Sequence, residues 1–272
     1  MSSLRSTRSC ALSHSSRSRR PRPRVATVEE FTDPHLGTYT PAPPPGPGVC
    51  DVCHGLPSPG YTRCWSCDNS AESVSRPLEL IVPISLYRVG EQLHTVLKDY
   101  KRSPSERVRQ RHLYQVAAIL HRFLREHAMC VEQAAGGTWD TVTIVPSKTP
   151  RVESHPLESA IKLGKNLRPL YRTLLAADQP ETIDRAYGDN RGFKTTEDVS
   201  GRRVLLIDDT FTSGATFQSA ASRLALDGAT VVAGVVIGRV IATGNPIYPA
   251  QDVFWDKQRE LGFSFDRCCL ES

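Results

Sequence analysis

The stretch VLLIDDTFTSGAT, residues 204–216, decides the fold class of this chain. Four apolar residues are typical of a buried strand, and ligands of open α/β sheets bind beyond the carboxyl ends of such strands. Two acids, Asp208 and Asp209, stand at that end. The small residues Thr212–Thr216 lead into a helix predicted over 216–226, whose first N–H groups are unpaired and attract an anion. We therefore expect a ligand with hydroxyls for the acids and a phosphate for the turn, such as a ribose 5-phosphate.

The surrounding segments alternate between strand-like and helix-like patterns. Their order predicts an α/β fold with a parallel sheet and right-handed crossovers. The polar residues 176–200 exceed the usual length of an unstructured connection, so we expect a functional loop or a strand hairpin there. Strands are expected over 78–85, 141–146, 202–209 and 229–240, and helices over 91–101, 105–131, 154–175 and 216–226.

Four cysteines form two pairs with the spacing of a metal site. Cys50 and Cys53 are separated by two residues, as are Cys64 and Cys67, with ten residues between the pairs. Two such pairs can close a tetrahedral site, which predicts a structural Zn²⁺ in a ribbon over 49–70. Because a segment of this length cannot form its own hydrophobic core, we expect metal binding to fold it. The remaining cysteines show no such pairing; the adjacent Cys268 and Cys269 are either buried or metal-binding.

The net charge of +5 on the 272 residues is uneven. Residues 1–24 contain seven arginines and no acid, and 41–48 read PAPPPGPG, so 1–48 are expected to be a disordered arm. A globular domain is expected over 77–272. No apolar run approaches the ~20 residues of a membrane span, and the N-terminus lacks the apolar segment of a secretory signal. We therefore expect a cytoplasmic protein without membrane contact.

Several other functions of paired acids fit the loop less well. A haloacid-type phosphatase needs a second acid where Thr210 stands, and a Walker loop needs a lysine that this turn lacks. A response-regulator receiver needs an aspartate at the end of a later strand, but 229–240 ends without one. An acid pair that only caps the following turn remains an alternative.

The loop resembles the phosphoribosyl-pyrophosphate (PRPP) loop of type I phosphoribosyltransferases, which has four apolar residues, two acids and then Thr-x-Thr/Ser-Gly-x-Thr. The resemblance implies that the two acids bind the ribose hydroxyls and that the turn binds the 5-phosphate. VPSK at 145–148 resembles the family's pyrophosphate loop, which implies that Lys148 neutralises pyrophosphate beside Mg²⁺. The implied catalytic residues are Asp208, Asp209 and Lys148, and the implied PRPP-binding residues are Asp208, Asp209, Thr210, Thr212, Ser213, Gly214, Ala215 and Thr216.

A four-cysteine ribbon, then LKDYK at 97–101, then a PRPP loop is similar to the order in the ComF family of competence-related, amidophosphoribosyltransferase-like proteins. The resemblance implies a type I phosphoribosyltransferase-like parallel sheet flanked by helices and preceded by a small zinc ribbon. One departure is clear: the family's Arg-Gly-Phe-Asn-Gln stretch is replaced by RVESHPLESA at 151–160, and RGFK occurs later, at 191–194. Details of the acceptor site therefore do not transfer.

Two functions are compatible with these features. The first is transfer or hydrolysis of the 5-phosphoribosyl group of PRPP, with an unidentified nitrogenous acceptor and release of Mg-pyrophosphate. The second is a non-catalytic PRPP-binding protein in DNA handling or regulation, in which the ribbon or the arginine-rich arm contacts single-stranded DNA or a competence helicase. A ribbon that only stabilises the transferase domain is a third role for the cysteines. The oligomeric state stays open.

Overall fold

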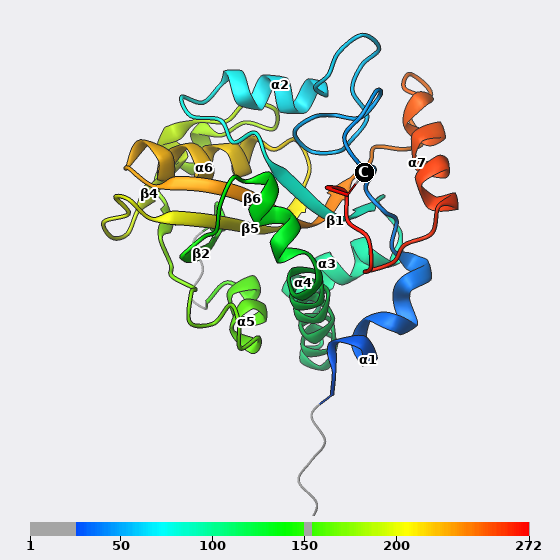
Figure 1. Ribbon diagram of the computed structural model, residues 1–272, viewed down its shortest axis with the longest axis horizontal. Helices are drawn as coiled ribbons and strands as arrows, with labels where there is room; N and C mark the ends of the chain where they lie inside the picture. Colours follow the sequence, from blue (N-terminus) through cyan, green and yellow to red (C-terminus); the bar gives the residue numbers. More distant parts are fainter. Residues whose placement is uncertain (1–25, 150–153, 272) are drawn as a thin grey trace, which may run out of the picture.

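The computed structural model describes residues 26–149 and 154–271, and a four-stranded parallel sheet lies at its centre (Figure 1). The strand order is β1-β6-β5-β2, and each neighbouring pair is parallel. A separate antiparallel hairpin, β3 with β4, fills part of 176–200. The strands are β1 (Ile81–Tyr87), β2 (Thr141–Ile144), β3 (Leu175–Ala177), β4 (Phe193–Thr195), β5 (Arg203–Phe211) and β6 (Thr230–Val240). The predicted parallel α/β fold is confirmed.

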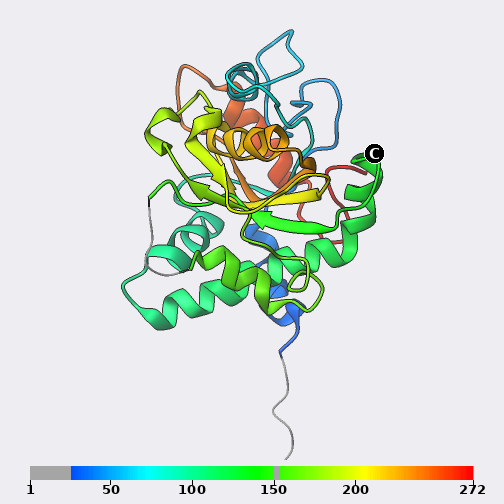
Figure 2. The same cartoon turned by 90° about the vertical axis from the view of Figure 1, so that its left-hand side faces the viewer.

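Helices cover both faces of this sheet. Figure 2 shows α6 on one side and α3, α4 and α5 on the other. The α-helices are α1 (Val28–Thr32), α2 (Trp65–Glu72), α3 (Gln92–Arg102), α4 (Glu106–Ala134), α5 (Pro156–Leu163), α6 (Ala215–Leu226) and α7 (Ala250–Glu260). Three short 3₁₀ helices are η1 (Asp33–Thr38), η2 (Pro180–Thr182) and η3 (Asn190–Gly192). None of the helices in the described ranges has the length and apolar character that a membrane span requires.

Two apolar layers explain why β5 reads as a continuous hydrophobic run. Leu205 and Ile207 belong to the core shared with α3 and α4, whereas Val204 and Leu206 belong to the core shared with α6. Successive side chains of a strand point to opposite faces, so a strand covered on both faces is apolar at every position. The four cysteines of the predicted ribbon belong to the α6 layer.

The segment 26–48 differs from the disordered arm that its composition predicts. It forms α1 and η1, and α1 packs against α4. Tyr39 is buried, and the backbone N–H of Leu86 in β1 donates to the carbonyl of Thr40 at 2.8 Å. The apolar residues of this segment find their partners on α4 and β1, which a composition rich in proline conceals. Residues 1–25 of the predicted arm lie outside the described residues.

The region after β2 also differs from its prediction. The helix expected over 154–175 ends at Leu163, because Gly164 leaves the helical conformation and caps it with φ −88° and ψ 135°. Helix α7 follows the last strand and was not predicted. Its apolar anchors, Phe254 and Trp255, are buried in the main core.

We expect Tyr39→Ala to lower the free energy of unfolding by about 3 kcal/mol or more, the usual cost of truncating a buried aromatic side chain. Tyr39 packs edge-on against Phe263, with ring centroids 5.3 Å apart, and its hydroxyl accepts from Gln115 Nε2 at 3.2 Å. Tyr248→Ala is the matched control because Tyr248 is exposed, and it should change stability little. Urea denaturation of both variants checks this, and equal effects would contradict the packing of the segment.

Candidate functional site

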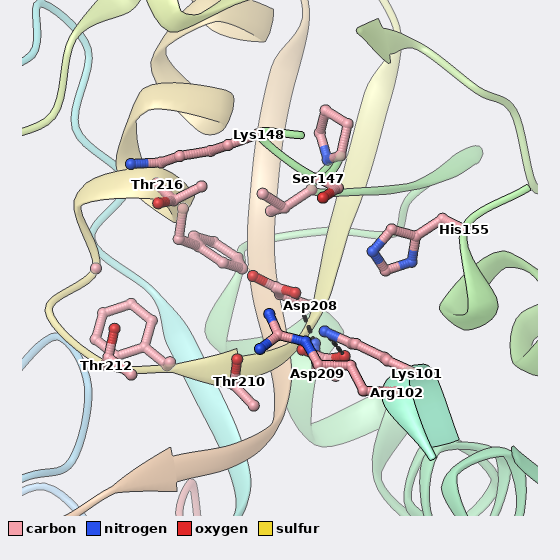
Figure 3. A pocket seen from close by; sticks show the side chains of 15 residues that line it. Lys101, Arg102, Ser147, Lys148, His155, Asp208, Asp209, Thr210, Thr212 and Thr216 are labelled. Carbon is pink, nitrogen blue, oxygen red and sulfur yellow. Dashed lines mark hydrogen bonds and ion pairs between the residues drawn. The ribbon is translucent and has the colours of Figure 1, made fainter. Parts of the chain in front are cut away.

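A cavity of about 200 Å³ lies beyond the carboxyl ends of β2 and β5 (Figure 3). These strands are parallel neighbours, with Ile144 paired to Ile207, so the chain following each strand reaches the same edge of the sheet. The cavity is thus where an open α/β fold binds ligands. It is lined by Lys101, Arg102, Val145, Pro146, Ser147, Lys148, His155, Asp208, Asp209, Thr210, Phe211, Thr212, Gly214, Thr216 and Phe217.

The two acids occupy different environments. Asp208 is half-buried, and one of its carboxylate oxygens accepts the backbone N–H of Asp209 at 2.8 Å. Asp209 is fully buried, and its Oδ2 accepts the hydroxyl of Tyr100 and forms an ion pair with Lys101. Its Oδ1 is buried and has no hydrogen-bond partner among the residues that the structure describes. An unsatisfied buried acceptor is costly, so this oxygen is suited to a ligand donor.

Burial also changes the acidity of both groups. It raises the pKa of Asp208 to about 6, against the opposing charge of Lys101, and it raises the pKa of Asp209 to about 7. A carboxyl group shielded from water loses the hydration of its charged form. Both acids therefore change charge in the physiological pH range.

The turn between β5 and α6 is built around Gly214. This residue caps the N-terminus of α6 with φ +82°, and a Cβ there would lie 2.5 Å from the ring of Phe211. Within the described ranges, no side chain makes a capping hydrogen bond to this helix. The first N–H groups of α6 therefore remain available to an anion.

Most of the predicted PRPP-binding residues line the cavity. Ser213 instead lines a neighbouring cavity of about 700 Å³, which Thr212 also borders, and Ala215 is buried. Those lining the first cavity are Asp208, Asp209, Thr210, Thr212, Gly214 and Thr216, together with Lys148.

Lys148 reaches the site from the segment after β2. Its Nζ donates to the carbonyl of Ile183 at 2.9 Å, and burial lowers its pKa while Asp184 opposes that effect. The polar loop 176–200 therefore anchors Lys148, although the cavity lining contains no residue of this loop. The alternative of a strand hairpin in this loop is confirmed by β3 and β4.

Four further polar residues line the cavity and were not predicted as site residues: Lys101, Arg102, Ser147 and His155. Arg102 follows Lys101 at the end of α3, so two cations stand together at one helix terminus, which is the signal that could have identified them. His155 caps α5, where its Nδ1 accepts the N–H of Leu157 at 3.2 Å. A lone histidine before a helix offers no comparable signal.

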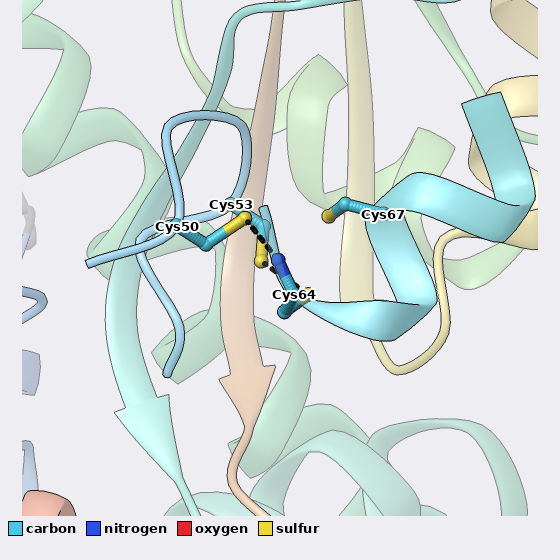
Figure 4. A group of neighbouring side chains, drawn as sticks. All are labelled: Cys50, Cys53, Cys64 and Cys67. Carbon is cyan, nitrogen blue, oxygen red and sulfur yellow. Dashed lines mark hydrogen bonds between the residues drawn. The ribbon is translucent and has the colours of Figure 1, made fainter. Parts of the chain in front are cut away.

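The four predicted metal ligands converge (Figure 4). All four cysteines are buried, and their sulfur atoms lie within 4.8 Å of one another. Cys53 Sγ and Cys64 Sγ are 3.7 Å apart, close to the ~3.8 Å edge of a tetrahedron with Zn–S bonds of about 2.3 Å. The hydrogen bond with Cys50 and the charge of Arg239 help to lower the pKa of Cys53 to about 7, which favours the thiolate that binds metal. The group therefore fits a metal ion such as zinc.

Arg239, near the end of β6, joins the cysteine group to the turn. Its Nε donates to Cys53 Sγ at 3.3 Å, and its Nη1 donates to the carbonyl of Thr212 at 2.7 Å. Burial alone would lower the pKa of Arg239, but the nearby cysteines, among them Cys53 and Cys64, raise it, so the side chain is charged. A single arginine in an otherwise apolar strand is the signal that sequence reasoning passed over.

Comparison with known proteins assigns no family: no family model matches the chain, and no curated protein is similar to it. The function must therefore be argued from the chemistry of the cavity and of the cysteine group.

We expect Cys50→Ser/Cys53→Ser to lower the zinc content by one ion per chain, because two of four thiolates are lost. Removing the metal should also weaken the packing of 49–70, whose buried cysteines form part of the α6-side core. Elemental analysis of the purified protein and limited proteolysis measure the two effects. An unchanged zinc content would show that these thiolates do not hold the ion.

Proposed function

We propose that this chain binds PRPP in the cavity at the end of β5 and transfers its 5-phosphoribosyl group to a nitrogenous acceptor. One observation carries the proposal: the Asp208–Asp209 pair borders a cavity that is also bordered by the glycine-led N-terminus of α6 and by Lys148. Acids, backbone N–H groups and a cation suit three different parts of one ligand.

Each chemical group of PRPP has a complementary group in the lining of the cavity. Ribose hydroxyls are donors, and Asp208 and the unpartnered Oδ1 of Asp209 are acceptors. The 5-phosphate suits the N-terminus of α6, where backbone N–H groups and the helix dipole favour an anion. The pyrophosphate suits the cations that also line the cavity, which are Lys148, Lys101 and Arg102.

In the proposed reaction, the bond between the anomeric carbon and the pyrophosphate oxygen breaks and its electron pair leaves with pyrophosphate. The lone pair of the acceptor nitrogen forms the new C–N bond, and the nitrogen then loses a proton. Positive charge develops on the sugar, where Asp208 is placed to stabilise it, while the three cations stabilise the leaving group. Oxygen donors such as Asp208 suit Mg²⁺, which supplies further positive charge to the pyrophosphate when bound with it.

Affinity for PRPP should fall by about tenfold or more between roughly pH 8 and pH 6, because both acids accept ribose hydroxyls as carboxylates. Their pKa values of about 6 and 7 mean that lowering the pH through this window protonates them and removes the charge. Calorimetric titration with PRPP and Mg²⁺ measures the dependence. Asp208→Asn is the control, since phosphate also titrates near pH 6. This variant should bind weakly and show a flatter profile; an unchanged profile would contradict the role of Asp208.

Gly214→Ala should weaken PRPP binding by about tenfold or more, because a Cβ 2.5 Å from the Phe211 ring would displace the turn. Gly201→Ala is the matched control: Gly201 has φ +73°, so the backbone strain is similar, but no atom lies within 4 Å of its Cβ position. The same titration compares the two variants. Equal PRPP affinity in both would contradict a phosphate at this turn.

Release of pyrophosphate separates catalysis from binding. The proposal expects pyrophosphate to appear when PRPP, Mg²⁺ and a panel of amine or nucleobase acceptors are supplied. Tight binding of PRPP without release of pyrophosphate to any acceptor or to water would favour the non-catalytic alternative. Salt-sensitive binding of single-stranded DNA would then connect that alternative to the predicted DNA-handling role.

A further inference from the structure

A second group of metal-binding side chains lies far from the first in the sequence. His127 and Cys130 are one turn apart on α4, and Cys268 and Glu271 belong to the segment that follows α7. One ligand atom of each lies within 4.8 Å of the others. No spacing pattern groups these residues, since they span more than half of the chain.

The orientation of His127 is that of a metal ligand. The ring is buried, and its Nε2 donates to the carbonyl of Phe265 at 2.7 Å. This hydrogen bond places the proton of the neutral ring on Nε2 and leaves the lone pair of Nδ1 directed at the other three residues. Ligating histidines commonly use one ring nitrogen for such a carbonyl and the other for the metal.

The remaining distances fit a tetrahedral ion. His127 Nδ1 is 3.4 Å from Glu271 Oε1 and 3.7 Å from Cys130 Sγ, and Cys130 Sγ is 3.3 Å from the same Oε1. Zinc with usual bond lengths separates nitrogen and oxygen ligands by about 3.4 Å, and a sulfur from either by about 3.6 Å. The second oxygen of Glu271 accepts the N–H of Cys268 at 3.1 Å, which orients the carboxylate.

We propose that His127, Cys130, Cys268 and Glu271 bind a second Zn²⁺ ion. This ion ties the C-terminal segment to α4. The tied segment carries Phe265, whose ring packs against Tyr39 of the N-terminal segment, so the site holds both ends of the described chain on the core. The two simpler explanations of the group are a Cys130–Cys268 disulfide and an imidazolium–carboxylate pair, and each gives a different experimental result.

Zinc content of the full-length protein, reduced with a phosphine and equilibrated with Zn²⁺, tests the proposal. The native chain should hold two ions and Cys130→Ser one, and Glu271→Gln should bind the second ion roughly tenfold or more weakly. Cys269→Ala is the matched control. Cys269 is adjacent to Cys268 but is buried, with its sulfur 3.9 Å from the carbonyl of Pro83, so this variant should keep two ions.

Titration with Co²⁺ keeps the test decisive if a variant folds poorly. The native chain should show two cobalt sites with sulfur-to-metal absorption, and Cys50→Ser/Cys53→Ser should retain the one that contains Cys130. The proposal is overturned if the reduced native chain holds one ion that this double variant loses. It is also overturned if peptide mapping of the native chain finds a Cys130–Cys268 disulfide that persists in the presence of zinc.

Discussion

The buried guanidinium of Arg239 is the interaction on which the arrangement of both predicted sites depends. A charge inside a protein is tolerated only when it is paired and hydrogen-bonded, and Arg239 is paired with the sulfur of Cys53 and bonded to the carbonyl of Thr212. It also lies over the ring of Phe211, 5.2 Å from its centroid. Strand β6 thus holds the cysteine group on one side and the turn between β5 and α6 on the other.

This arrangement changes how the cysteine segment is understood. Its composition suggested a module set apart from the domain over 77–272, but its four cysteines share a core with Ile81 and Phe211. If the thiolates were lost, Arg239 would keep its hydrogen bonds to backbone carbonyls but would lose its negatively charged partner, and an unpaired buried charge typically costs several kcal/mol. The four cysteines therefore help to support the turn that borders the cavity, through their contact with Arg239.

The cavity itself combines opposite charges in a small space. Asp209 is held by Tyr100 and Lys101, which fixes the end of α3 against the end of β5. The same contact brings Lys101 and its neighbour Arg102 to the cavity, where the charge of Lys101 opposes that of Asp208. The ligand proposed above, with hydroxyl donors and several negative charges, would match both the acids and the cations of this cavity.

Local sequence patterns predicted the structural features that depend only on residues close together in the sequence. The apolar run of β5, the Asp208–Thr216 loop and the paired cysteines each follow from spacing alone, and the parallel register then brings Lys148 to the same edge. Contacts between distant segments could not be predicted in this way. The helix expected over 91–101 contains Tyr100, but its helical spacing does not show that the hydroxyl reaches Asp209. The same holds for the partners of Arg239, for the burial of Tyr39 and for the grouping of His127 with Glu271.

A crystal structure of the protein with PRPP and Mg²⁺ tests the central claim most directly. The account predicts density for the 5-phosphate on the backbone N–H groups of 212–216, ribose hydroxyls at the carboxylates of Asp208 and Asp209, and pyrophosphate beside Lys148. Density for the ligand at any other place, or an empty turn at saturating PRPP, would contradict it.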